Sequence, residues 1–153
     1  EIKIPDKDVL QILVDGKGKV FMSLDKQADL ASTLESVGGQ YGIKFTPEEI
    51  KKFKLSNTFG VPIKSMKTFL GLPKDKQDEV LANEGIPTDS LDNQFKVWVK
   101  TTRATNPELR IAIKADQETP YSVIKNVMNS LQDLKENRYN LITSLKVTEE
   151  EKK

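Results

Sequence analysis

The amino-acid sequence predicts an α+β fold, a two-layer sandwich in which a small mixed β-sheet carries helices on one face, plus a helical insertion. Three patterns support this prediction. Two apolar runs near the start are joined by turn-forming residues, and residues 109–147 show strand, helix and strand patterns in succession. The segment from about 38 to 90 holds short helix patterns separated by glycine and proline. Because the strands alternate rather than being uniformly apolar, helices are expected on one face only.

The first element is a β-hairpin. Residues 10–14 and 20–24 are strand-like, and Asp-Gly-Lys-Gly at 15–18 connects them. The pair Asp15-Gly16 is expected to supply the positive φ values that a tight hairpin turn requires. Residues 1–9 alternate apolar and charged residues around a proline, which is typical of a linker that can add to a sheet edge.

A helix is expected over residues 26–37, because Leu30, Leu34 and Val37 recur at spacings of four and three. Asp25 is expected to cap its start. The pair Gly38-Gly39 is expected to end it.

The insertion, at about 38–90, contains a sequence pattern that is typical of the start of a helix. Thr46-Pro47-Glu48-Glu49 has the pattern of a capping box with proline in the first turn. Short amphipathic segments follow near residues 63–70 and 74–83, each bounded by glycine or proline. The phenylalanines of this segment are expected to be buried structural residues rather than a ligand site: Phe53, Phe59 and Phe69.

Residues 91–147 predict helix, strand, helix and strand. The strand at 109–115 should bury one face and expose the other, and the helix at 120–136 should be capped by Thr119, start at Pro120 and end at Asn137. The last strand is expected at 139–147, followed by a charged tail at 148–153. Two strands joined by such a helix should pair in parallel. The expected buried stripes are Leu91, Phe95, Trp98, Val99 and Thr102 for the helix at 91–105, and Tyr121, Ile124, Val127, Met128, Leu131 and Leu134 for the helix at 120–136.

Composition excludes several chemistries. The chain has no histidine and no cysteine, which removes Ser-His-Asp and Cys-His nucleophiles and nearly all structural zinc sites. Lys and Arg total 24 against 23 for Asp and Glu, with the signs alternating along the chain, so no nucleic-acid partner is expected. No catalytic, cofactor-binding or metal-binding residue is predicted. The expectation is a domain that is not an enzyme and acts by binding other macromolecules.

Three pieces of sequence resemble the ExbD/TolR family: the run 109–116 (Leu-Arg-Ile-Ala-Ile-Lys-Ala-Asp), Thr119-Pro120-Tyr121 and Val127-Met128. Their order and spacing resemble the family's strand ending in Ala-Asp, its Tyr-containing helix start and its Val-Met pair. The resemblance covers residues 10–24 and 91–147. The sequence departs from the family in having Asn137 where a glycine is usual, and in the insertion, which we expect in ExbD-like proteins of Bacteroidota.

The resemblance implies a location and a mechanism. Residues 10–147 would form the periplasmic domain of a single-pass inner-membrane protein of a Gram-negative bacterium, and residues 1–9 would follow a missing transmembrane helix. That helix would lie in an ExbB- or TolQ-type channel and use the proton motive force. The domain would act on a TonB-like or TolA-like protein in biopolymer transport, as a homodimer. A TolR-like role in binding peptidoglycan remains the close alternative.

The partner-binding candidates are Asp116, Pro120, Tyr121, Tyr139 and Leu141. For Asp116 a plain role as a turn acceptor is the favoured interpretation. A rival from another class is a small carboxylate-dependent hydrolase, which would need two acids converging in a cleft. The upstream reading frame discriminates between them, since an apolar span of about 20 residues carrying one Asp indicates the transducer.

Overall fold

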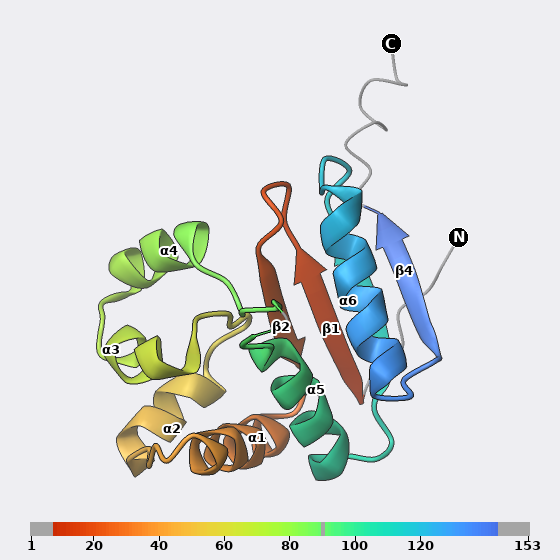
Figure 1. The fold of residues 1–153 in the computed structure, drawn as a ribbon. Coiled ribbons are helices and arrows are strands. Elements are labelled where there is room, and N and C mark those ends of the chain that lie inside the picture. Colours follow the sequence, from red (N-terminus) through yellow and green to blue (C-terminus); the bar gives the residue numbers. More distant parts are fainter. Residues whose placement is uncertain (1–7, 90, 144–153) are drawn as a thin grey trace.

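The computed structural model describes residues 8–89 and 91–143. Within these ranges the chain forms four strands, six α-helices and one 3-10 helix (Figure 1). In chain order they are β1 (Val9–Val14), β2 (Val20–Leu24), α1 (Gln27–Gln40), α2 (Pro47–Lys54), η1 (Ile63–Ser65), α3 (Met66–Leu70), α4 (Lys74–Asn83), α5 (Gln94–Thr105), β3 (Arg110–Ala115), α6 (Tyr121–Asp133) and β4 (Tyr139–Thr143).

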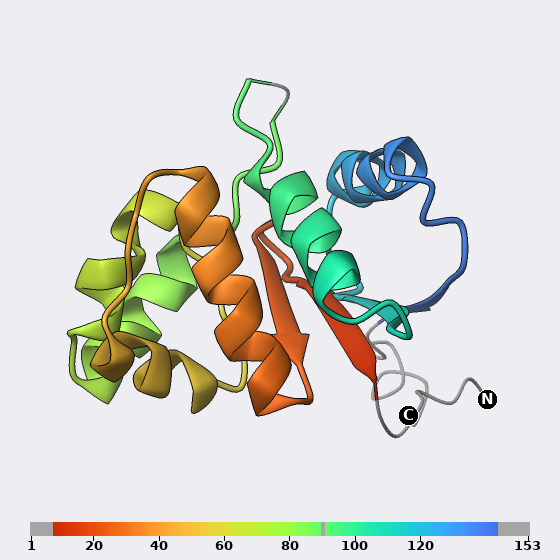
Figure 2. The ribbon, with the colours of Figure 1, turned by 90° about the horizontal axis from the view of Figure 1, so that it is seen from below.

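The strands form one mixed sheet in the order β2-β1-β3-β4. β1 and β2 pair antiparallel as a hairpin, whereas β3 lies parallel to both β1 and β4. Helices α1, α5 and α6 lie on one side of this sheet, as the view from below shows (Figure 2). The predicted α+β class, the mixed sheet and the parallel pairing of β3 with β4 are therefore confirmed.

One hydrophobic core lies between the sheet and these helices. Ile111 of β3 and Val127 of α6 belong to the same buried cluster, as the predicted sandwich requires. The far face of the sheet is less exposed than the alternation predicted, because Ala112 on that face is fully buried and Phe21 of β2 is 8 % exposed. β3 is thus buried on both faces at its centre, and the prediction of one wet face was wrong there.

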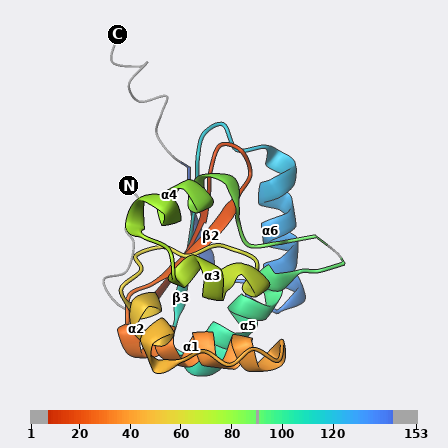
Figure 3. The ribbon, with the colours of Figure 1, turned by 90° about the vertical axis from the view of Figure 1, so that its left-hand side faces the viewer.

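The insertion lies beyond β2 and carries α2, α3 and α4 (Figure 3). The predicted capping box is present: the Thr46 hydroxyl accepts the Glu49 N–H, and the Glu49 carboxylate accepts the Thr46 N–H. Three fully buried rings hold the insertion to the framework. Phe59 packs against Phe53 of α2 and against Trp98 of α5, with ring centroids 4.9 and 4.7 Å apart.

The hairpin turn differs from the prediction in its details. The positive φ belongs to Gly18 and not to Asp15-Gly16. Asp15 instead organises the loop through its carboxylate, which accepts the N–H groups of Lys17 and Lys19. The turn is therefore an Asx-type loop, in which a short acidic side chain replaces a main-chain acceptor.

Two predicted helix caps were wrong for the same reason. The Asp25 carboxylate accepts the N–H groups of Asp8 and Val9 instead of capping α1. The Thr119 hydroxyl donates to the carbonyl of Asp15 at 2.9 Å, so the N-cap of α6 is Pro120 without a side-chain bond. In both cases a partner distant in sequence competes successfully for the side chain.

Three predicted boundaries also moved. α1 continues through Gly38 and Gly39 to Gln40, and Gly38 lies where the following chain, at Ile43 and Phe45, packs against the helix. The left-handed residue after α6 is Lys135 and not Asn137. Leu91 lies before α5 and is 96 % exposed, so it is not part of the buried stripe.

Tyr121, at 72 % exposed, also lies outside its predicted stripe. Residues 144–147 of the predicted last strand lie outside the described residues.

Candidate functional site

The five predicted contact residues fall into two groups. Asp116 directly follows the last residue of β3, and Pro120 and Tyr121 begin α6. Tyr139 pairs with Ile111 at the other end of β3, and Leu141 pairs with Ile113 in its middle. The structure therefore brings Asp116, Pro120 and Tyr121 together at one end of the sheet but places Tyr139 and Leu141 along its edge.

Asp116 acts within its own turn. Its carboxylate accepts the Glu118 N–H at 2.8 Å, its carbonyl accepts the Thr119 N–H at 3.0 Å, and its own N–H donates to the Val14 carbonyl. All three bonds fix the loop between β3 and α6. The turn-acceptor interpretation of Asp116 accounts for these contacts.

The same loop is fastened to the hairpin turn. Besides the Thr119 bond to Asp15, Gly18 lies so close to α6 that a Cβ there would be 2.9 Å from a methyl group of Val123. Gly18 also has a φ of +87°, which only glycine adopts freely. This end of the sheet is consequently a rigid platform, and it presents the exposed ring of Tyr121 to solvent.

The edge strand β2 is closed. The Met22 N–H donates to the Phe59 carbonyl at 2.8 Å and the Phe59 N–H donates to the Met22 carbonyl at 2.9 Å. Farther along, the Ile86 N–H donates to the Val20 carbonyl at 2.8 Å. The N–H and carbonyl of Met22 and the carbonyl of Val20, which point away from β1, thus already have partners from the insertion.

The opposite edge of the sheet is strand β4. Among the described residues, none donates to or accepts from its outer side, because β4 pairs with β3 alone. The strand contains neither proline nor a charged residue, the features that commonly protect a sheet edge. Tyr139 and Leu141 are half-buried on it. The outer side of β4 can therefore accept a further strand, and we name it the β4 edge.

An ion pair holds the chain in place just before β4. The Arg103 guanidinium of α5 binds Glu136 through two parallel bonds of 2.8 Å, and it also donates to the Pro107 carbonyl. Glu136 raises the pKa of Arg103, so the charge persists at every relevant pH. Because such a bidentate pair is directional, it fixes the position at which the chain turns into β4.

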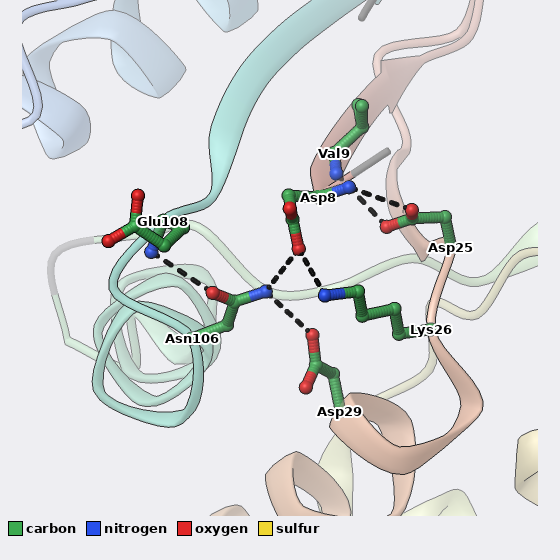
Figure 4. Close-up of polar contacts among 7 residues, drawn as sticks. All are labelled: Asp8, Val9, Asp25, Lys26, Asp29, Asn106 and Glu108. Atoms are coloured by element: carbon green, nitrogen blue, oxygen red, sulfur yellow. Dashed lines mark hydrogen bonds and ion pairs between the residues drawn. The ribbon is translucent and has the colours of Figure 1, made fainter. Parts of the chain in front are cut away.

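Acidic side chains gather at the end of the sheet where β1 begins (Figure 4). Asp8 has a φ of 58°, and its carboxylate accepts bonds from Asn106 and Lys26. Asn106 also donates to Asp29 at 2.9 Å, and Asp25 holds the N–H groups of Asp8 and Val9. The Asp8 carboxylate raises the pKa of Lys26. These contacts join β1, β2, α1 and the end of α5, which is a structural role.

A polar groove of about 460 Å³ lies between α5 and α6 and the loop before α5. Asn93 caps α5 and donates to the Ser130 hydroxyl at 3.1 Å, and Lys96 pairs with Asp133 at 2.7 Å. These bonds connect the two helices across the groove floor. No group of three or more His, Cys, Asp or Glu side chains in residues 8–89 and 91–143 is placed to hold a metal ion. The helices in these ranges are also too short or too polar to cross a membrane.

Comparison with known proteins returns no match. No protein-family model, no curated protein and no solved structure matches the chain.

Sequence reasoning missed the residues that close β2. Phe59 was expected to be buried, but its pairing with β2 was not predicted. The residues around it lack the apolar-polar alternation of a strand, because a single bridge between two residues requires no strand on the Phe59 side. The available signal was a pair of glycines, Gly60 and Gly85, in a segment otherwise made of short helices. Isolated glycines often mark places where two backbones approach closely.

Proposed function

We propose that this chain binds a protein partner by adding one extended segment of it to the β4 edge. The observation that carries the proposal is that no described residue pairs with the outer main-chain groups of β4, whereas Met22 and Val20 of β2 are bonded to the insertion. Strand addition gives affinity through ladder hydrogen bonds and needs no deep pocket. It also suits a chain with a net charge of +1, for which long-range electrostatic capture is weak.

We further propose that the domain works as the periplasmic part of an ExbD-like energy transducer. It would couple proton flow through an ExbB-type channel to a TonB-like protein in outer-membrane transport. Support comes from the arrangement of the resembling residues: the Ala115-Asp116 strand end, the Thr119-Pro120-Tyr121 helix start and the parallel β3–α6–β4 unit occur in the order that the resemblance implies. A TolR-like contact with peptidoglycan is the alternative within the same family.

The hydrolase alternative gains no support from the carboxyl groups described. Lys67, whose ammonium group lies 2.7 Å from Glu49, lowers the pKa of that carboxyl, and the Thr46 N–H adds to the effect. A general acid acting near neutral pH needs the opposite shift. The acids at the start of β1 are engaged in bonds that join secondary-structure elements.

An NMR titration tests strand addition. The probe is a synthetic peptide from the periplasmic linker of the TonB-like protein encoded in the same genome. Amide shifts are expected along residues 139–143 and the adjoining β3. Substituting the exposed Asn140 with lysine should weaken binding about tenfold, because a charged side chain on an edge opposes pairing.

The matched control is Asn126→Lys, which makes the same change at an exposed position of α6. This variant should bind the peptide as the unmodified chain does. Shifts confined to the insertion, or equal weakening by both lysine variants, would contradict strand addition at β4.

A further inference from the structure

The insertion meets β2 at two separate points. Phe59 exchanges a reciprocal pair of main-chain bonds with Met22, and Ile86 donates to Val20. Phe59 lies between α2 and η1, whereas Ile86 follows α4, so two separate parts of the insertion converge on one strand. Phe59 and Ile86 thus occupy the positions that a fifth strand of another molecule would take.

Glycine permits both approaches. A Cβ on Gly60 would lie 2.3 Å from Cδ1 of Phe21 and 3.0 Å from the Val20 carbonyl oxygen. A Cβ on Gly85 would lie 3.1 Å from the Val20 nitrogen. A Cβ on Gly60 would force the Phe21 ring or the insertion to shift, whereas a Cβ on Gly85 would require its neighbours on β2 to move by a few tenths of an ångström.

The contact is anchored in the core. The Phe59 side chain is 1 % exposed and packs between the rings of Phe53 and Trp98. Nearby, the buried Gln94 side chain of α5 accepts the Ile63 N–H at 2.8 Å. Moving the segment off β2 would therefore expose an aromatic core residue as well as break three main-chain bonds. A flap that lay only on the surface could open without exposing a core residue, so its opening would cost less free energy.

We propose that Phe59 and Ile86, with Gly60 and Gly85, form a permanent built-in cover of β2, which leaves β4 as the edge that the described residues keep free for pairing with another chain. A second copy of this chain and an extended partner then compete for the β4 edge, so a bound partner excludes a dimer formed there. The competition rests on the proposed function. The closure of β2 does not.

Amide hydrogen exchange on the full chain tests the closure. The Met22 and Ile86 amides should exchange within about tenfold of the amide of Ile12, which lies in the central strand β1. In Gly60→Ala their protection should fall at least about tenfold, and the variant should form assemblies larger than a dimer, because two edges are then open. Gly39→Ala is the matched control, since a Cβ there meets nothing within 4 Å.

Rapid exchange of the Met22 amide in the unmodified chain would overturn the closure. Unchanged exchange and assembly in Gly60→Ala would overturn it as well. If Gly60→Ala does not fold, Gly85→Ala replaces it, because its closest contacts are the milder 3.1 and 3.2 Å. That variant should lose protection at Ile86 and retain it at Met22. Retained protection at both amides in Gly85→Ala would again count against the proposal.

Sedimentation velocity with a fluorescent form of the linker peptide tests the competition. The peptide should travel with monomeric protein at a ratio of one to one, and adding it should dissociate any dimer. Peptide travelling with a dimer would refute mutual exclusion. A peptide that does not bind at any concentration would refute the proposed function, while the exchange experiment would still decide the closure of β2.

Discussion

The two edge strands of the sheet are alike in length and in lacking proline and charge, but their surroundings are opposite. β2 and β4 each span five residues, and neither contains proline or a charged side chain. The insertion covers β2, whereas β4 has no main-chain neighbour on its outer side among the described residues. Their own sequences therefore do not distinguish a closed edge from an open one. The difference arises from residues far away in the chain, above all Phe59.

Among the substitutions considered, Phe59→Ala should have the largest effect on the difference between the covered strand β2 and the uncovered strand β4. The ring is fully buried against Phe53 and Trp98, so its loss should destabilise the protein by about 3–5 kcal/mol. Urea unfolding followed by tryptophan fluorescence measures the change. Leu55→Ala is the control, because Leu55 lies in the same insertion but is 68 % exposed, and its effect should stay within about 0.5 kcal/mol. Similar losses for both variants would show that Phe59 anchors nothing.

Two neighbouring glycines, Gly38 and Gly39, test how tightly the insertion is packed where it begins. A Cβ on Gly38 would lie 2.6 Å from the Ile43 carbonyl oxygen and 2.7 Å from the Phe45 ring, so Gly38→Ala should destabilise by about 1–3 kcal/mol. Gly39→Ala has open space and lies within a helix, and should stabilise by about 0.5–1 kcal/mol. Thermal unfolding of both variants checks the signs. Equal signs would mean that the insertion is loosely packed where it leaves α1.

The smallest expected effect concerns the ion pair within the insertion. Glu49→Gln keeps the capping geometry but removes the charge facing Lys67, and should cost about 0.5 kcal/mol at pH 7 because the pair is partly exposed. Since the folded-state pKa of Glu49 lies below 4.5, the ordinary value for a glutamate, its contribution to stability is present above that pH. It is lost as the pH falls through the folded-state pKa.

Urea unfolding of Glu49→Gln and the unmodified chain, at pH 7 and near pH 3, follows this loss. The difference in the free energy of unfolding should shrink at the lower pH. A difference that is the same at both would show that the ion pair contributes no stability.

Patterns contained within one short segment predicted this structure well. The capping box at Thr46 and Glu49 formed as expected, and α4 begins at Lys74 and ends at Asn83 as its pattern indicated. The parallel pairing of β3 and β4 followed from general handedness and connection rules. In each case the decisive residues lie near one another in the chain.

Contacts between distant segments could not be predicted in the same way. Asp25 and Thr119 are good caps by residue type, but Asp8 and Asp15 bind them in the folded chain. For the candidate site, no sequence pattern distinguishes the outer arm of the hairpin from the last strand as the free edge of the sheet. Only the pairing of Phe59 with Met22 removes the outer arm of the hairpin from consideration.

The order of the strands also determines how the sheet would bear a mechanical load. β1 and β4 both run parallel to β3, so Asp8, just before β1, and Thr143, at the end of β4, lie at opposite ends of the sheet (Figure 1). A tension between these two points runs along the strands. It therefore loads the hydrogen bonds between β1, β3 and β4 in shear, all at the same time. The pull at Asp8 enters β1, an inner strand that Asp25 also ties to the end of β2, whereas the pull at Thr143 enters the edge strand β4.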